Sequence, residues 1–367
     1  MLFKNSSLVG LLALSLSFGG VPADAKCKSL PTPARLLEQL YQDALAEGGD
    51  FIVYQGGNGR SQGNGAMTLF NTRFPGMNLT VIVNMSGVHA EAIDAQLAEG
   101  KPIPSVIALQ TINDYARWKS QGNLVEYRPP LWEKVYGDVK DPEGYFTGLS
   151  GFTFAPVASR AAFDSGDAPI EAQDFLDPKY KDRIALTYPQ DDDAILLTFY
   201  KYVMDYGWDY INRLTTQNVT WVRGAAATTA VISNGTVPNG VTFTGNTPLV
   251  TQTNARMVTR IPEKSWFTLG IQYGAIPKNA PRPAAAKLYL AWRLTEDVQR
   301  SNLVGWPTRS DISPKVGQKG MFEYSNTSPT IYNEFLLNRT LVESFRSEIE
   351  SIIGPVRGDT PLNNPNL

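Results

Sequence analysis

The stretch Phe51-Ile-Val-Tyr-Gln-Gly-Gly-Asn58 joins an apolar run to a glycine-rich turn, the pattern of a buried strand that leads into a helix. Two further apolar runs follow at 79–83 and 105–109, and an amphipathic helix is expected between them over 89–99, ending at Gly100. Strands that alternate with helices indicate βαβ units and a parallel sheet. The sequence therefore predicts an α/β fold.

The second half of the chain repeats this alternation after a break. Residues 127–144 are rich in proline and mixed charge, which predicts an irregular crossing segment and a boundary near Thr147. A strand is expected over 152–158, a helix over 194–204, and a closing apolar helix over 284–294. A chain of 367 residues with this organisation is expected to hold two domains.

The N-terminal residues 1–25 have the features of a secretory signal peptide. Lys4 precedes an apolar run over 8–18, and the segment ends in Ala-Asp-Ala. The run is too short for a membrane span, which needs roughly 20 apolar residues. We expect a secreted mature chain that starts at Lys26 and carries one cysteine, Cys27, so that no intramolecular disulfide can form.

The composition is that of an ordinary globular protein, with 43% hydrophobic and 19% charged residues and a net charge of −2. There is no basic patch for nucleic acid or for an anionic membrane surface. Residues 361–367 lack the hydrophobic tail of a lipid anchor. We expect a monomer without membrane insertion, without a cofactor, and with a small molecule or ion as its partner.

The mature part contains N-x-S/T sequons, and together with the signal peptide they favour a eukaryotic secretory route. The first two sequons bracket a predicted strand, so we do not expect both to be occupied. The candidate glycosylation sites are Asn78, Asn84, Asn218, Asn234, Asn326 and Asn338.

Four stretches, in order along the chain, resemble the periplasmic solute-binding protein superfamily, type II. The likeness is strongest to the ferric-iron, thiamine and phosphonate-type receptors of bacterial ABC importers, and we expect a secreted eukaryotic, fungal-type relative. The stretches are Phe51 to Asn58, Gly144-Tyr-Phe-Thr-Gly-Leu-Ser150, the Asp-Pro and lysine-rich passage 174–187, and the Ala-Pro strand-to-helix passage 275–299.

The resemblance implies two α/β lobes joined by crossing strands, with a ligand held in the cleft as the lobes close. It implies lobe 1 over 26–147, lobe 2 over 148–255, and a return to lobe 1 with C-terminal helices over 256–367.

Ligands of open α/β sheets lie beyond the carboxyl ends of the strands, where helix N-termini point outward. Glycine at such turns allows a close approach of the ligand, although ordinary tight turns use the same residue. Ser86 is also explained as a helix cap. The turns that follow predicted strands supply the candidates Gly56, Gly57, Asn58, Ser86, Gly87, Gln110, Thr111, Arg223 and Gly224.

The triplet Asp191, Asp192 and Asp193 precedes an apolar helical run. Aspartates at this position either cap the helix and complement its dipole, or face the cleft and meet a cationic ligand or a hard metal ion. Arg223 could grip a carboxylate, which with the aspartates would make a site for a zwitterion. A simple Arg–Asp salt bridge across the cleft explains the same residues.

His89 lies in the first turn of a predicted helix, where its imidazole either faces the cleft or takes a surface or capping role. Tyr145, Trp266 and Tyr273 are candidates for aromatic walls of the cleft, with core packing as the alternative. The resemblance implies a tyrosine pair, often adjacent, for iron-binding members. This chain has no Tyr-Tyr dipeptide and a single histidine, which argues against a ferric site.

Few enzyme classes fit this sequence. Ser-His-Asp catalysis would rest on the one histidine, the one cysteine lies in the N-terminal tail, and no G-K-[ST] motif is present. Asp141, Glu143 and Asp192 are available as acids for a glycosidase. We expect a solute-binding protein that is not an enzyme; the alternatives are a carboxylate-based secreted hydrolase and an interaction protein that reuses the binder fold.

Overall fold

The computed structural model of the protein describes residues 32–245, 256–360 and 362. The predicted signal peptide, Cys27 and most of the segment 361–367 lie outside the described residues.

The first lobe is built on a parallel three-stranded sheet of order β2-β1-β3. The predicted parallel α/β pattern is therefore confirmed here, and the expected strand at 51–54 extends over β1. Phe51 of β1 packs edge-on against Phe70, with ring centroids 5.3 Å apart, and anchors the core of this lobe. Its elements are α1 (Pro33–Ala46), β1 (Asp50–Gly56), α2 (Asn64–Arg73), β2 (Asn78–Asn84), α3 (Ser86–Ala98), β3 (Val106–Ala108), α4 (Ile112–Ser120), α9 (Pro283–Arg293) and α10 (Glu296–Arg300).

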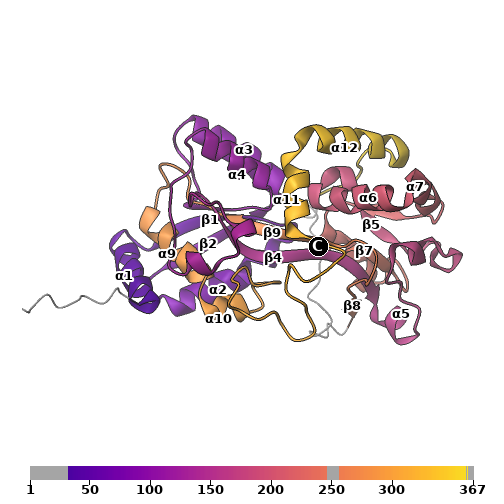
Figure 1. The fold of residues 1–367 in the computed structure, drawn as a ribbon, viewed down its shortest axis with the longest axis horizontal. Coiled ribbons are helices and arrows are strands. Elements are labelled where there is room, and N and C mark those ends of the chain that lie inside the picture. The colour runs from indigo at the N-terminus through magenta and orange to yellow at the C-terminus, as the bar shows by residue number, and fades with distance from the viewer. Residues whose placement is uncertain (1–31, 246–255, 361, 363–367) are drawn as a thin grey trace, which may run out of the picture. The chain divides into compact units, whose positions relative to one another are not determined.

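Two long antiparallel strands connect the lobes, β4 (Thr147–Ser159) and β9 (Thr268–Gly274). β4 pairs with β9 up to Phe154 and then continues beside β7 and β8 in the second lobe. Figure 1 shows β4 and β9 side by side between β1 and β2 on one side and β7 on the other. The segment 127–144 before β4 holds only short 3-10 turns, as its proline content predicts.

The second lobe combines a parallel pair, β5 and β6, with the antiparallel strands β7 and β8 on β4. Its core forms around α6, whose apolar face is buried from Ala194 to Phe199. Its elements are α5 (Arg160–Asp164), β5 (Ala185–Thr187), the 3-10 turn η6 (Pro189–Asp191), α6 (Asp193–Tyr206), α7 (Trp208–Thr215), β6 (Thr220–Val222), α8 (Ala225–Ser233), β7 (Val241–Gly245) and β8 (Met257–Thr259).

Two helices follow the return to the first lobe, α11 (Pro329–Leu337) and α12 (Arg339–Ile353). α11 packs against α4 and β9, whereas α12 packs against α6 and η6 of the second lobe. Figure 1 shows α12 beside α6. The last helical segment of the chain therefore lies on the second lobe rather than on the first.

The sequons lie in different local settings. Asn78 and Asn84 are the first and last residues of β2, so they do bracket a strand. Asn78, Asn218, Asn234 and Asn338 are exposed. The Nδ2 of Asn326 donates to the backbone carbonyls of Pro262 and Ser265 at 2.9 and 2.7 Å, which occupies the atom that would carry a glycan.

Candidate functional site

A cleft of about 440 Å³ lies where strand ends and helix N-termini of both lobes meet. The first lobe contributes the turn after β1 and the starts of α3 and α4, and the second contributes the starts of α6 and α8. α11 and α12 complete the lining. The predicted residues that line the cleft are Gly57, Asn58, Ser86, Gly87, Gln110, Thr111, Asp191, Asp192, Asp193, Arg223 and Gly224.

The floor of the cleft, on the side of the first lobe, is formed by turns that are hydrogen-bonded to one another. Ser86 Oγ accepts a hydrogen bond from the backbone N–H of Gln110 at 3.3 Å, which ties the turn after β2 to the turn after β3. Gly56 lies directly behind this hydroxyl, and a Cβ at Gly56 would overlap Ser86 Oγ. Gly56 does not line the cleft; its missing side chain makes room for Ser86, and this corrects its assignment as a ligand contact.

The first-lobe wall carries one ion-pair group. Arg117 donates to both carboxylate oxygens of Asp94, at 2.7 and 2.9 Å, and to Asp114 at 2.9 Å. These bonds raise the pKa of Arg117, the pair with Asp94 first. Glu91 faces the same cleft and has no partner among the described residues. This wall is therefore acidic overall.

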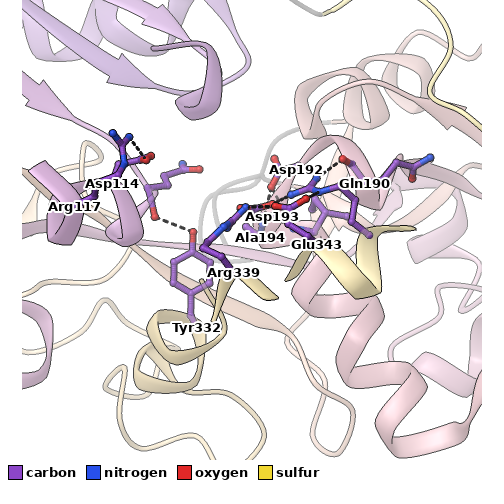
Figure 2. Close-up of polar contacts among 12 residues, drawn as sticks. Asp114, Arg117, Gln190, Asp192, Asp193, Ala194, Tyr332, Arg339 and Glu343 are labelled. Carbon is purple, nitrogen blue, oxygen red and sulfur yellow. Dashed lines mark hydrogen bonds and ion pairs between the residues drawn. The ribbon is translucent and has the colours of Figure 1, made fainter. Parts of the chain in front are cut away.

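Each of the three successive aspartates on the second-lobe wall has a different role. Asp191 pairs with Arg223 through two bonds of 2.8 Å, both residues belonging to the same lobe. Asp193 pairs with Arg339 at 2.7 Å and with Arg346. Figure 2 shows Asp192 and Asp193 facing Asp114 and Arg117 of the other wall, with Tyr332 between them.

Asp192 is the N-cap of α6, and its Oδ1 accepts from the N–H groups of Ala194 and Ile195 at 2.9 and 3.2 Å. This is the capping role considered for the triplet. No described residue donates to Oδ2, although Asp192 lines the cleft. Burial raises the pKa of Asp192 to about 6, and the neighbouring carboxylates act in the same direction.

Several polar groups of the cleft have no partner. The side chain of Asn58 is without a hydrogen bond among the described residues, yet this residue is only 8% exposed and lines the cleft. The hydroxyl of Thr111 and the Oδ1 of Asn113 are buried and likewise unpaired. Buried polar groups normally have a partner, so these atoms mark positions where a ligand would supply one.

The histidine and the three aromatic candidates do not line the cleft. His89 faces the core: its ring stacks on Tyr54 with centroids 4.5 Å apart, its Nε2 lies 3.0 Å from the Ile82 carbonyl oxygen, and burial lowers its pKa. Trp266 is buried and donates through Nε1 to Thr268.

The three aromatic candidates follow the alternative of core packing rather than lining the cleft. The Tyr145 ring lies under Lys119, 5.2 Å from its Nζ, away from the cleft. Tyr273 is fully buried and accepts a hydrogen bond from Asn333. Large rings gain more from filling the core than from lining a polar cleft: Trp266 and Tyr273 are buried in it, and the half-buried Tyr145 packs against it.

The cleft also contains residues that the sequence did not indicate. Arg117 had a local signal, because it follows Asp114 by three positions on a helix. Arg339 and Arg346 have Glu343 as a local partner, but no local signal places them or Tyr332 at the cleft, since their cleft partners lie far away in the sequence.

Comparison with known proteins identifies the fold. The family model described as bacterial extracellular solute-binding protein matches residues 101–243. A substrate-binding protein of an ABC transporter from Agrobacterium tumefaciens is similar in structure, with a TM-score of 0.69 and 13% identity over 83% of this chain and 94% of that one. The chain therefore has the two-lobed fold of these solute-binding proteins, and its residues 101–243 match the model of one such family.

Other solved structures with this fold carry different ligands. Iron-bound HitA from Pseudomonas aeruginosa matches with a TM-score of 0.62 and 16% identity over 82% of this chain and 99% of that one. The periplasmic binding protein AfuA from Actinobacillus pleuropneumoniae, with bound fructose-6-phosphate, matches with a TM-score of 0.63 and 17% identity over 82% and 98%. At such identities the likeness shows the fold. Comparison with curated protein sequences found no match.

Two further observations bear on the class of protein. Within the described ranges, no cluster of three or more His, Cys, Asp or Glu side chains is arranged to hold a metal ion. None of the helices in those ranges has the length and apolar character of a membrane span.

Proposed function

We propose that this protein is a secreted solute-binding protein that captures a small cationic or zwitterionic organic molecule in the cleft between its lobes. The observation that carries this proposal is the pairing of the cleft arginines. Arg117, Arg223, Arg339 and Arg346 all lie in ion pairs with carboxylates, while Glu91 and the Oδ2 of Asp192 have no donor among the described residues.

The free groups of the cleft set the chemistry of the ligand. Unpaired carboxylate oxygens accept hydrogen bonds and attract positive charge, so they favour an ammonium or another donor-rich cation. Arg223 binds Asp191 through Nε and one Nη, and no described residue accepts a hydrogen bond from its other Nη, which could meet an acidic group of the same ligand. A metal ion is not favoured, because the described residues contain no metal-binding cluster.

The hydrolase alternative has little support in this geometry. The acids considered for it do not meet, because Asp141 and Glu143 both bind Lys119, at 2.7 and 2.6 Å, and neither lines the cleft. His89, the one possible base for a serine nucleophile, is buried in the core. Binding without turnover is therefore the function that we propose.

The test is a thermal-shift and calorimetric screen with thiamine, amino acids, polyamines, sugar phosphates and metal ions. A cationic or zwitterionic ligand should raise Tm, with a stabilisation of about 2.7 kcal/mol when it is present at a hundred times its Kd. Asp192→Asn and Glu91→Gln should each weaken binding, whereas Glu99→Gln, an exposed residue outside the cleft, should not. A screen without any shift would refute the proposal, and preferential binding of sugar phosphates would refute the ligand class.

Secretion is tested separately. Protein recovered from the culture medium of a secreting host should begin at Lys26 by N-terminal sequencing. An intact start at Met1 in the medium would contradict signal-peptide cleavage.

A further inference from the structure

The C-terminal helices join both lobes at the cleft. Tyr332 of α11 donates to the Gln110 carbonyl of the first lobe at 3.1 Å. Arg346 of α12 donates to the Gln190 carbonyl of the second lobe, and Gln190 in turn donates to the Gly354 carbonyl at 2.8 Å. α12 is thus fastened to the turn from which α6 begins.

The strongest of these contacts converge on a single carboxylate. Asp193 is the first residue of α6 and is only 17% exposed at its side chain, where it meets both Arg339 and Arg346. Glu343 of α12 pairs with the same two arginines. Two cations and two carboxylates therefore balance one another beside Asp192.

We propose that Arg339 and Arg346 are positioning residues of the ligand site: by holding Asp193 they keep the N-terminus of α6 in place, so that Asp192 presents its free oxygen to the ligand. This inference rests on the proposed function, since it concerns the same cleft. An independent sign that the cleft receives a ligand is Asn58, whose polar side chain is 8% exposed and unpaired among the described residues.

The charge next to Asp192 depends on this arrangement. Without the two arginines, Asp193 and Glu343 would remain as uncompensated negative charges, and a nearby like charge opposes ionisation of a carboxyl group. Without the carboxylate of Asp193, the arginines would leave an excess of positive charge, which favours ionisation. The charged and titratable groups on the elements around Asp192 are Asp191, Asp193, Arg223, Tyr332, Arg339, Glu343 and Arg346, with Glu91, Asp94, Asp114 and Arg117 on the opposite wall.

The experiment measures the pH at which Asp192 ionises in the folded protein, without any ligand. Urea unfolding free energies are recorded between pH 4 and pH 8 for each variant and for the same variant carrying Asp192→Asn, and the difference isolates this group. The double variant Arg339→Gln, Arg346→Gln should raise the midpoint of Asp192 ionisation by about one pH unit, and Asp193→Asn should lower that midpoint.

Two controls keep the result decisive. Arg300→Gln removes an exposed arginine of the Arg300–Glu296 pair on α10 and should leave the midpoint unchanged. Lys substitutions at 339 and 346 keep the charge and should restore a midpoint near that of the wild type. The inference would be overturned if the arginine double variant and Asp193→Asn shifted the ionisation midpoint of Asp192 in the same direction, or if neither variant shifted it.

A second arm uses spermidine as the cationic probe. At pH 6, the Arg339→Gln, Arg346→Gln variant should bind it roughly fivefold more weakly than the wild type, because a one-unit rise in pKa from about 6 lowers the ionised fraction of Asp192 by about that factor. If the midpoints move as expected but neither spermidine nor any other compound of the screen binds the wild type, the proposed function fails while the action of the arginines on Asp192 stands. Unchanged spermidine affinity in a variant whose midpoint has moved would overturn the role in the ligand site.

Discussion

Replacing Gly56 by alanine should disrupt the floor of the cleft for a purely steric reason. Gly56 ends β1 with a backbone conformation that alanine tolerates, but the added Cβ would overlap the Oγ of Ser86. Overpacking of this kind costs about 1–3 kcal/mol of unfolding free energy. Removal of the hydroxyl by Ser86→Ala loses the hydrogen bond from Gln110, worth about 0.5–1.5 kcal/mol.

The double variant separates this cause from a general loss of stability. Once the hydroxyl is gone, the nearest atoms to the new Cβ are the Cβ at position 86 and the Cα of Leu109, both 3.4 Å away. Gly56→Ala should then cost almost nothing, so the two substitutions should couple by about 1–3 kcal/mol in a double-mutant cycle.

Urea unfolding followed by tryptophan fluorescence measures the four free energies of this cycle. Gly87→Ala is the matched control, because Gly87 lines the same cleft and a Cβ there meets nothing within 4 Å. Additive effects of Gly56→Ala and Ser86→Ala, or an equal loss for Gly87→Ala, would refute the steric explanation.

Three further predictions concern charge and modification. Burial raises the pKa of Asp192 to about 6 from 3.8, so the folded state retains a proton that the unfolded state loses; from pH 4 to pH 6 the wild type should lose about 2 kcal/mol of unfolding free energy relative to Asp192→Asn, and parallel curves would contradict this. The pH dependence that His89 contributes has the opposite sign, because burial lowers the pKa of its imidazole in the folded state. The unfolding free energy of the wild type relative to His89→Gln should therefore fall as the pH drops below 6.5. A rise on acidification would contradict this. In protein from a eukaryotic secretory host, peptide mapping should find a glycan on exposed Asn234 but none on Asn326, whose Nδ2 donates hydrogen bonds to two backbone carbonyls. The reverse pattern would show that these hydrogen bonds do not prevent glycosylation.

The turns of the cleft were predictable because they follow from strand order. Parallel strands end at a common edge, so the residues after β1, β2 and β3 must lie together once the sheet forms. The same rule applies to β5 and β6 in the second lobe. Gly57, Ser86 and Thr111 are therefore found in one cleft with Asp191 and Gly224.

The partners of these residues were not predictable from local pattern. Asp193 pairs with Arg339, 146 positions later in the chain, and no rule of strand order places α12 on α6. The direction of a side chain was equally hidden: His89 lies within the cleft-forming helix α3, yet its ring turns to Tyr54 and the Ile82 carbonyl in the core. The residue type determines the chemistry that a side chain can offer, whereas tertiary packing determines whether that side chain points into the cleft or into the core.

The attachment of α12 to α6 also has a consequence for how the protein is made. Asp193 leaves the ribosome long before Arg339, so the start of α6 is synthesised without the cations that will balance it. Contacts between such distant segments form late, because the chain must first close a long loop. During synthesis the second lobe can therefore assemble most of its core, but the wall that faces the cleft must wait for α12. A chain interrupted before Arg339 would present an unneutralised Asp193 at its cleft and would lack the buried side chains of α12, Val342, Phe345 and Ile349.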